Sequence, residues 1–395
     1  MFLALLEIRL ISMAKEIKNL RRVSQRILKA IKEKEKIILY GDADLDGLAS
    51  VIMLRESIKS LNAETAAIYF PDRQKEGYGL NFKALNYLKK QAPALLIVLD
   101  CGISNFAEAE KAEKMGFDLI IIDHHEVLDK LPKASIVVDP KRKDDQYPFK
   151  RLAAAGIVFR LTKLLFGRKF SPKLKESFTE LTALATVADM MPNEAENRPI
   201  ISQGLSTIKR TFRPGLKVLW EKYDSGHFEM EVFQKVISAL NFSGVNHHLL
   251  DAYYLLTVSS EKEAKKIAGK VLRKNRERQQ RVREIVAEIS ERIAENPAGP
   301  IVFEIGRGWE TILLGSIASK ICREYHKPTF IIRKDASQSR GAVRMLKGFN
   351  GVEALKTCAD YLITFGGHPM AAGFAVENKN LEKLEKDLNK YFKKL

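Results

Sequence analysis

The segment that decides the fold spans residues 37–47 and reads Ile-Ile-Leu-Tyr-Gly-Asp-Ala-Asp-Leu-Asp-Gly. A short apolar run ends at Asp42, and two further aspartates follow at alternate positions. Three later apolar runs also stop at an aspartate, namely Asp100, Asp123 and Asp139, and helical patterns lie between the runs. Continuous apolar strands that alternate with helices predict a parallel sheet covered on both faces. The aspartates should therefore meet along the carboxyl edge of that sheet.

The rest of the chain predicts a helical part and a second α/β part. Residues 150–215 read as mostly helical and include an apolar stretch that ends near Asp189. Residues 261–295 form a long helical pattern that is apolar at both ends and polar in the middle, as expected of a helix that bridges two domains. From residue 301 short strands and helices alternate again, with a glycine-rich turn predicted at 366–368.

The composition is that of a globular protein with an anionic partner. The chain has 395 residues, of which 46% are hydrophobic and 29% charged, and its formal net charge is +17. Such an excess of Lys and Arg favours a polyanionic partner such as nucleic acid or an anionic membrane surface. The three cysteines are too few for a disulfide framework, and no apolar run has the length of a membrane span. We expect a cytoplasmic protein without a membrane partner.

The alternating carboxylates Asp42, Asp44 and Asp46 point to a cation. Three acids so close together cannot all be ionised unless a cation compensates them. An EF-hand calcium loop also alternates acids, but it needs a Glu at its twelfth position, where this chain has Met53. A charged surface turn after a strand is the alternative interpretation.

A second group of candidate ligands is Asp123-His124-His125, which also follows a strand. Imidazole and carboxylate together suit Mn²⁺, Zn²⁺ or Fe²⁺. The pair His247-His248 follows no predicted strand and has no neighbouring acid, so we interpret it as structural or surface.

The aspartates and histidines at one sheet edge suit two metal ions roughly 3.5–4 Å apart, an arrangement typical of phosphoryl hydrolysis. The sequence has no Walker A motif, no dinucleotide-binding glycine motif at a strand end and no nucleophile elbow. These absences disfavour nucleotide-triphosphate, dinucleotide and serine-hydrolase chemistry.

These motifs, taken in order, resemble the four metal motifs of the DHH phosphoesterase superfamily: GDADLDG (41–47), LDCGIS (99–104), IDHH (122–125) and TVADMMP (186–192). GGHPMAAGF (366–374) is similar to the signature of the DHHA1 substrate domain. Three further segments resemble the RecJ-like single-strand exonuclease branch: LAAAGIVFRL (152–161), FRPGLKVL (212–219) and LNFSG (240–244).

The resemblance implies an α/β fold in which a parallel-sheet DHH domain is joined by a long helix to a smaller α/β DHHA1 domain, with the active site in the cleft between them. The expected parts are an N-terminal helical extension (1–35), the DHH catalytic domain with its helical part (36–255), a connector helix (256–298) and the DHHA1 domain (299–395).

The resemblance also assigns roles to site residues. The expected ligands of two Mn²⁺ ions, or Mg²⁺ as the second choice, are Asp42, Asp44, Asp46, Asp100, His124 and Asp189. Among the catalytic residues, Asp100 would bridge the metals, His125 would be a further ligand or contact the scissile phosphate, and Asp123 would orient the histidines. The expected substrate-binding residues are Ser339, Arg340, Gly366, Gly367 and His368.

The activity implied is that of a two-metal, single-strand-specific exonuclease that releases 5′ mononucleotides from DNA, or also RNA, in the 5′–3′ direction during repair or recombination. One alternative is an oligoribonuclease or small-nucleotide phosphodiesterase of the same superfamily. Another is a non-catalytic replication scaffold, although scaffold members have lost metal acids that this chain keeps.

Three features depart from the RecJ-like pattern. Trp309-Glu310-Thr311-Ile312 and Ser243-Gly244-Val245 stand where that branch has a histidine-glycine turn and an Ala-Gly-Arg segment. The sequence also ends about 20 residues after the glycine signature, so we expect no OB-fold that would grip single strands. A replication or repair protein is the expected partner in its place.

Overall fold

The computed structural model describes residues 16–128, 130–224, 226, 228–241, 244–296 and 299–394. The chain divides into two compact units, Met1–Asn275 and Arg276–Leu395. The division falls inside helix α12 (Glu261–Glu295), which is the long helix predicted from the sequence. Residues 1–15 of the predicted N-terminal extension lie outside the described residues. Among the helices described, none has the length and apolar character needed to cross a membrane.

The first unit is built on the predicted parallel sheet, with the strand order β2-β1-β3-β4-β5. Its strands are β1 (Ile37–Gly41), β2 (Ala67–Tyr69), β3 (Ala94–Leu99), β4 (Phe117–Ile122) and β5 (Ile136–Val138), and every pairing between them is parallel. Strand β2 is absent from the sequence prediction because it is a three-residue edge strand and only partly buried. Its residues Ala-Ile-Tyr are apolar, but so short an apolar run does not distinguish a strand from other structure.

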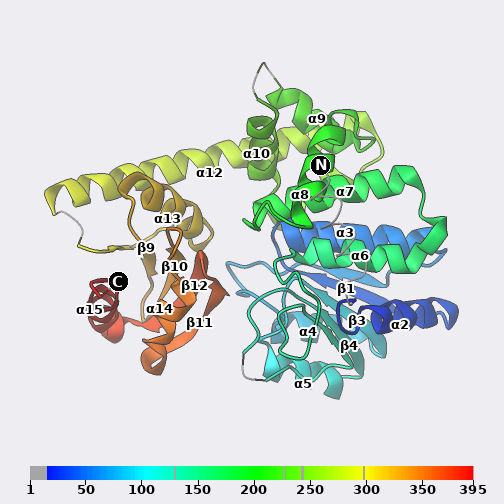
Figure 1. Cartoon of the computed structure of the whole chain (residues 1–395), viewed down its shortest axis with the longest axis horizontal. Coiled ribbons are helices and arrows are strands. Elements are labelled where there is room, and N and C mark those ends of the chain that lie inside the picture. The colour runs from blue at the N-terminus through cyan, green and yellow to red at the C-terminus, as the bar shows by residue number, and fades with distance from the viewer. Residues whose placement is uncertain are drawn as a thin grey trace. The chain divides into compact units, whose positions relative to one another are not determined.

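Helices cover both faces of this sheet, which explains the uninterrupted apolar runs (Figure 1). Ile37 and Leu39 face a core shared with α3 (Leu45–Ser60) and α6 (Ala154–Phe166). The intervening Ile38 and Tyr40 face a second core. That core includes α4 (Phe82–Leu88) and α5 (Phe106–Lys114). Successive side chains of a strand point to opposite faces, so a strand buried on both sides must be apolar throughout.

The remainder of the first unit is helical, as predicted for residues 150–215. Its helices are α2 (Leu20–Lys32), α7 (Pro172–Ala188), α8 (Asn197–Thr207), α9 (Pro214–Tyr223), α10 (Glu229–Leu240) and α11 (Asp251–Thr257). A two-stranded hairpin, β6 (Val245–Asn246) with β7 (Leu249–Leu250), links α10 to α11. Short 3₁₀ helices in the two units are η1 (Lys89–Gln91), η2 (Gly167–Lys169), η3 (Ile208–Arg210), η4 (Ala359–Tyr361) and η5 (Asn378–Asn380).

The second unit is a mixed five-stranded sheet, ordered β11-β12-β10-β9-β8, with helices on both faces. Its strands are β8 (Val302–Gly306), β9 (Thr329–Lys334), β10 (Gln338–Arg344), β11 (Leu362–His368) and β12 (Ala371–Glu377). Its helices are α13 (Thr311–Tyr325), α14 (Gly351–Lys356) and α15 (Leu381–Phe392). The prediction of a glycine-rich turn at 366–368 is wrong. These residues end β11 and pair with β12, because the turn of this hairpin lies at Pro369-Met370.

Candidate metal centre

The loop between β1 and α3 brings the alternating aspartates to the carboxyl edge of the sheet. Asp44 caps α3, because its Oδ1 accepts hydrogen bonds from the amides of Asp46 (3.0 Å) and Gly47 (3.1 Å). A Cβ at Gly47 would lie 2.3 Å from the carbonyl oxygen of Asp42, so the turn requires glycine at that position. The motif therefore combines a helix cap with a tight backbone approach.

Asp46 has a second structural partner, the start of α6. Its two carboxylate oxygens accept from the amides of Ala154 (2.8 Å) and Ala155 (2.7 Å). The helix N-terminus favours the charged form, but burial and the nearby Asp44 together raise the pKa of Asp46 to about 7. Asp46 is thus fixed in orientation while its charge remains under-compensated.

Three carboxylates surround the imidazole of His124, which is fully buried. Its Nε2 lies 3.2 Å from Asp100 Oδ1, 3.6 Å from Asp46 Oδ2 and 3.5 Å from Asp189 Oδ2. Asp189 is the C-cap of α7. A carboxylate at that end of a helix opposes the helix dipole, so this position favours a nearby cation.

The electrostatics of the cluster also favour a cation. Burial, followed by repulsion from Asp46, raises the pKa of both Asp100 and Asp189 well above the ordinary value. Asp100 Oδ1 is buried, and although His124 Nε2 lies 3.2 Å away, this oxygen accepts no hydrogen bond of normal geometry from the described residues. Carboxylates that resist ionisation because they crowd one another become stable anions when a divalent cation joins them.

Asp100 belongs to three groups of potential ligands. Its carboxylate lies with those of Asp42 and Asp44 in one group, with Asp46 and His124 in a second, and with Asp123 and His125 in a third, and within each group the ligand atoms are within 4.8 Å of one another. The first two of these groups share the Asp100 carboxylate and have the form of a two-metal site. A donor set of carboxylates with one imidazole fits Mn²⁺ or Mg²⁺.

Asp123 orients the second histidine. Its Oδ1 accepts from the amide of His124 (2.7 Å) and lies 2.7 Å from His125 Nδ1, while Oδ2 accepts from the amide of Ile103 (3.0 Å). Burial alone would lower the pKa of His125, but the ion pair with Asp123 outweighs it and raises that pKa to about 9. Asp123 itself is buried, and His125 with the backbone amides keeps its pKa below the ordinary value.

Two residues at this edge are missing from the sequence prediction, Arg73 and Tyr78. Arg73 follows the edge strand β2 and donates from Nε to Asp42 Oδ1 (2.9 Å) and from Nη2 to Asp44 Oδ2 (3.0 Å) and to Asp42 Oδ2. The Tyr78 hydroxyl lies 3.2 Å from both ring nitrogens of His125. The only signal in the sequence would have been a strand just before Arg73, and β2 is too short to give one.

In the second unit, the predicted substrate-binding residues divide between the two faces of the sheet. Arg340 is exposed, and its partner on β12 is Ala375, on the face packed by α13. Gly366 and His368 lie on the same face, opposite Gly373 and Ala371. Ser339 points to the other face, where it is fully buried and donates to Asn378 Oδ1 (2.7 Å).

Arg344 is a further cation on the face that carries Arg340. It lies four residues along β10, and its Nε donates to Ser319 Oγ of α13 (3.0 Å). Gly367 has φ 132°, and a Cβ there would lie 2.5 Å from the carbonyl oxygen of Ala371, so glycine is required. On the face that carries Arg340 and Arg344, small residues of β11 and β12 form a floor beside the two arginines and His368. The floor residues are Gly366, Ala371, Gly373 and Ala375. The period of two along β10 could have identified Arg344.

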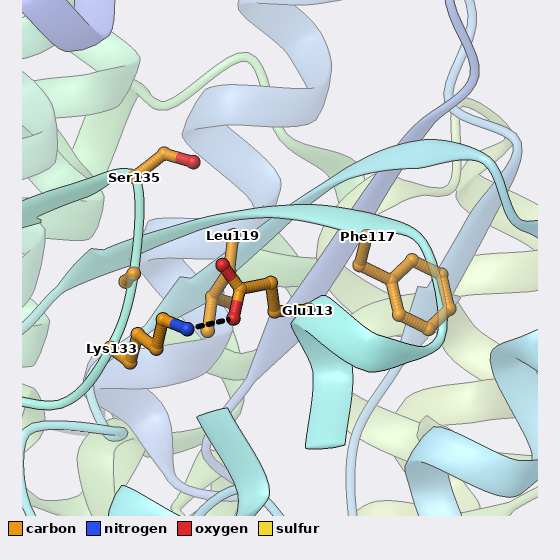
Figure 2. A pocket seen from close by; sticks show the side chains of 6 residues that line it. Glu113, Phe117, Leu119, Lys133 and Ser135 are labelled. Carbon is orange, nitrogen blue, oxygen red and sulfur yellow. Dashed lines mark ion pairs between the residues drawn. The ribbon is translucent and has the colours of Figure 1, made fainter. Parts of the chain in front are cut away.

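A hollow of about 190 Å³ lies elsewhere in the first unit, beside the amino end of β4 (Figure 2). An ion pair of 2.7 Å joins Lys133 to Glu113 across it. The lining residues are Glu113, Phe117, Leu119, Lys133, Ala134 and Ser135. This volume is below the ~300 Å³ at which small-molecule pockets usually begin, and the hollow is at the sheet edge opposite the aspartates.

Comparison with known proteins gives the same two parts. Residues 36–186 match the DHH family N-terminal domain, and residues 298–394 match the DHHA1 domain. The chain carries a DHH domain followed by a DHHA1 domain. The DHH match covers the β1–α3 loop, Asp100 and the two histidines, and the DHHA1 match covers the glycine-containing strand β11.

Relatives of this DHH protein include single-stranded-DNA-specific exonucleases named RecJ. The Bacillus subtilis protein is 35% identical over 95% of the chain, and the Salmonella typhimurium protein is 29% identical over 90%. The chain spans 48% of the length of the first and 66% of the second.

Among solved structures, exonuclease RecJ bound to manganese matches with a TM-score of 0.76 and 26% identity, over 96% of both chains. RecJ in complex with Mn²⁺ from Thermus thermophilus matches with a TM-score of 0.80 and 24% identity, over 97% of this chain and 56% of that one.

Proposed function

We propose that this chain is a divalent-metal-dependent exonuclease that hydrolyses single-stranded DNA from the 5′ end and releases 5′ mononucleotides. The observation that supports this most directly is the position of Asp100, whose carboxylate is shared by three groups of potential ligands. The names of the relatives, the net charge of +17 and the manganese in the matching structure agree with it.

The proposed metal ligands are the carboxylates and the imidazole that meet at the carboxyl edge of the sheet. When bound, two divalent ions would neutralise the crowded carboxylates and supply Lewis acidity toward a phosphoryl oxygen. Backbone amides donate hydrogen bonds to the carboxylates of Asp44 and Asp46 and hold them in place. Little reorganisation of these side chains is therefore needed when metal ions bind. The ligands we propose are Asp42, Asp44, Asp46, Asp100, His124 and Asp189.

Other residues of this edge would act on the substrate. Asp123 accepts a hydrogen bond from Nδ1 of the His125 imidazolium. The other ring nitrogen, Nε2, would then donate a hydrogen bond to a phosphate oxygen. Arg73 now neutralises Asp42 and Asp44, and its planar guanidinium is equally suited to a phosphate group. Cations bound by these carboxylates would release Arg73 for that purpose.

In the second unit, we infer that the floor of small residues binds nucleotide phosphates or the terminal nucleotide. Gly366 and Gly373 are exposed and leave room for a close backbone approach, while Arg340, Arg344 and His368 supply donors beside them. Ser339 is excluded from this role, because its hydroxyl is buried against Asn378.

The test is a length series of single-stranded oligonucleotides, labelled at either the 5′ or the 3′ end, with Mn²⁺ and with EDTA. We expect metal-dependent release of mononucleotides from the 5′ end and no digestion of a blunt duplex. The double variant Asp44→Asn, His124→Ala should be inactive, and His247→Ala, at an exposed histidine, should match the wild type.

Three results would contradict the proposal. Digestion by the double variant at the wild-type rate would refute the metal site. Activity confined to oligonucleotides of a few nucleotides would favour an oligoribonuclease or small-nucleotide phosphodiesterase. Binding of DNA without hydrolysis under any metal would favour a replication scaffold.

A further inference from the structure

The metal-binding loop of the first unit is held from outside by a side chain remote in sequence. Asn241 follows the last residue of α10, and its Oδ1 accepts a hydrogen bond of 2.9 Å from the amide of Leu45, 196 residues earlier in the chain. Leu45 lies between Asp44 and Asp46, at the first turn of α3. The contact therefore reaches the backbone between two proposed metal ligands.

This contact differs from three other amide contacts of the loop. The amide of Ala43 donates to Asp42 (2.7 Å), and those of Asp46 and Gly47 donate to Asp44. These bonds are internal, so they move with the loop. The Leu45 amide is buried and finds its acceptor on another element. A buried amide must be paired, so the bond to Asn241 joins the middle of the loop to the end of α10. It adds to two other anchors of the loop: the Asp42 amide, which donates to the carbonyl oxygen of Leu99 on β3 (3.2 Å), and the Asp46 carboxylate at the start of α6.

The segment that begins with Asn241 is itself anchored to the sheet. The carbonyl oxygen of His248, in the turn of the β6–β7 hairpin, accepts from the amide of Phe70 (2.9 Å). The His248 ring stacks on Tyr69, with ring centroids 4.2 Å apart. Phe70 directly follows the edge strand β2. The chain after α10 is thereby attached at both the metal-binding loop and the β2 edge.

We propose that Asn241 is a positioning residue for the metal centre: by accepting from the Leu45 amide it fixes the β1–α3 loop so that Asp44 and Asp46 hold their cations. This inference rests on the proposed function, since it takes the loop to be a metal site. Asn241 lies in none of the four metal motifs, and its contact is with the backbone amide of Leu45 and not with the carboxylate of Asp44 or Asp46.

The experiment measures Mn²⁺ binding by the full chain, from the electron paramagnetic resonance signal of free Mn²⁺. We expect Asn241→Ala to weaken binding by roughly 10–100-fold, as the loss of a supporting hydrogen bond around a metal site commonly does. Asn241→Asp keeps an acceptor at the same atom and should restore wild-type affinity. Saturating Mn²⁺ should return the kcat of Asn241→Ala toward the wild-type value, because metal occupancy limits that variant.

The matched control is Asp251→Asn, which removes ion pairs of the same region without touching the loop. It should lower stability and leave Mn²⁺ affinity unchanged. Thermal unfolding establishes that each variant is folded, and Asn241→Leu, which fills the site without an acceptor, replaces Asn241→Ala if that variant does not fold.

The outcomes separate the two claims. A wild-type chain that binds no Mn²⁺ refutes the proposed function. A wild type that binds Mn²⁺ with the same affinity as Asn241→Ala refutes the role of Asn241 alone. If Mn²⁺ affinity falls equally in Asn241→Ala and Asp251→Asn, or is not restored in Asn241→Asp, the effect is a general loss of stability and Asn241 is not a positioning residue.

Discussion

Arg73 and a bound metal ion should compete for the same carboxylates. In the structure the Arg73 guanidinium pairs with Asp42, whose side chain is 1% exposed, and with Asp44. Arg73→Ala therefore leaves a buried carboxylate without its cation. The consequence for stability should depend on whether a divalent ion takes the place of the guanidinium.

The size of the effect follows from burial. Removing one partner of a buried ion pair costs about 3–5 kcal/mol of the free energy of unfolding. The Arg73 side chain is 33% exposed, so solvent screening places the loss near the lower end, at about 3 kcal/mol. For a unit of this size, that loss lowers the Tm by roughly 6–12 °C.

The assay is thermal unfolding of the wild type and of Arg73→Ala, each in EDTA and in excess Mn²⁺. We expect the full deficit of Arg73→Ala in EDTA and a much smaller one in Mn²⁺, because ligand binding to the native state adds stability where the carboxylates are uncompensated. Arg168→Ala, at an exposed position in η2, is the control and should change the Tm little in either buffer.

A deficit of the same size in EDTA and in Mn²⁺ would refute the competition between Arg73 and the metal. A Tm unchanged by Arg73→Ala in EDTA would show that the Asp42 carboxyl simply takes up a proton when its partner is removed. Either result would require a different account of how this acidic cluster is stabilised.

Two further predictions concern the loop and its surroundings. Gly47→Ala should abolish Mn²⁺ binding, because its Cβ would lie 2.3 Å from the Asp42 carbonyl oxygen; titration calorimetry measures this. The control Gly269→Ala on α12, where a Cβ meets nothing within 4 Å, should instead stabilise the protein by about 0.5–1 kcal/mol, which scanning calorimetry measures. Asp251→Asn should cost about 1 kcal/mol at pH 7, because Asp251 accepts from two lysines of α12 that are partly exposed. Burial opposes ionisation of Asp251, but the lysines outweigh it and lower its pKa. The contribution is therefore present above the unfolded pKa of about 3.9 and is lost as the pH falls through the lower folded value. Urea unfolding of the wild type and of Asp251→Asn should show that their difference in free energy of unfolding is smaller in acid than at pH 7. A difference that stays constant with pH would contradict a stabilising ion pair at Asp251.

Much of the first unit could be predicted because its signals are local. A strand buried on both faces must be apolar along its whole length, so β1, β3, β4 and β5 are visible as runs, and an aspartate that ends such a run must lie at the carboxyl edge. The meeting of Asp42, Asp100 and His124 follows from that rule. Strand β2 escaped prediction because it has only three residues, and the end of β11 escaped it because Gly366, Gly367 and His368 give no apolar run.

The sequence by itself thus determined the parallel sheet, the acidic edge and the resemblance to a metal-dependent phosphoesterase. The tertiary structure alone decided that Arg73 neutralises Asp42, that Asn241 holds the Leu45 amide, and that Ser339 lies buried on the face opposite Arg340. The physical reason is that apolar periodicity reports which positions are buried against any neighbour. A hydrogen bond or ion pair between distant residues depends on the packing that brings two particular side chains within 3 Å, and no local pattern records that.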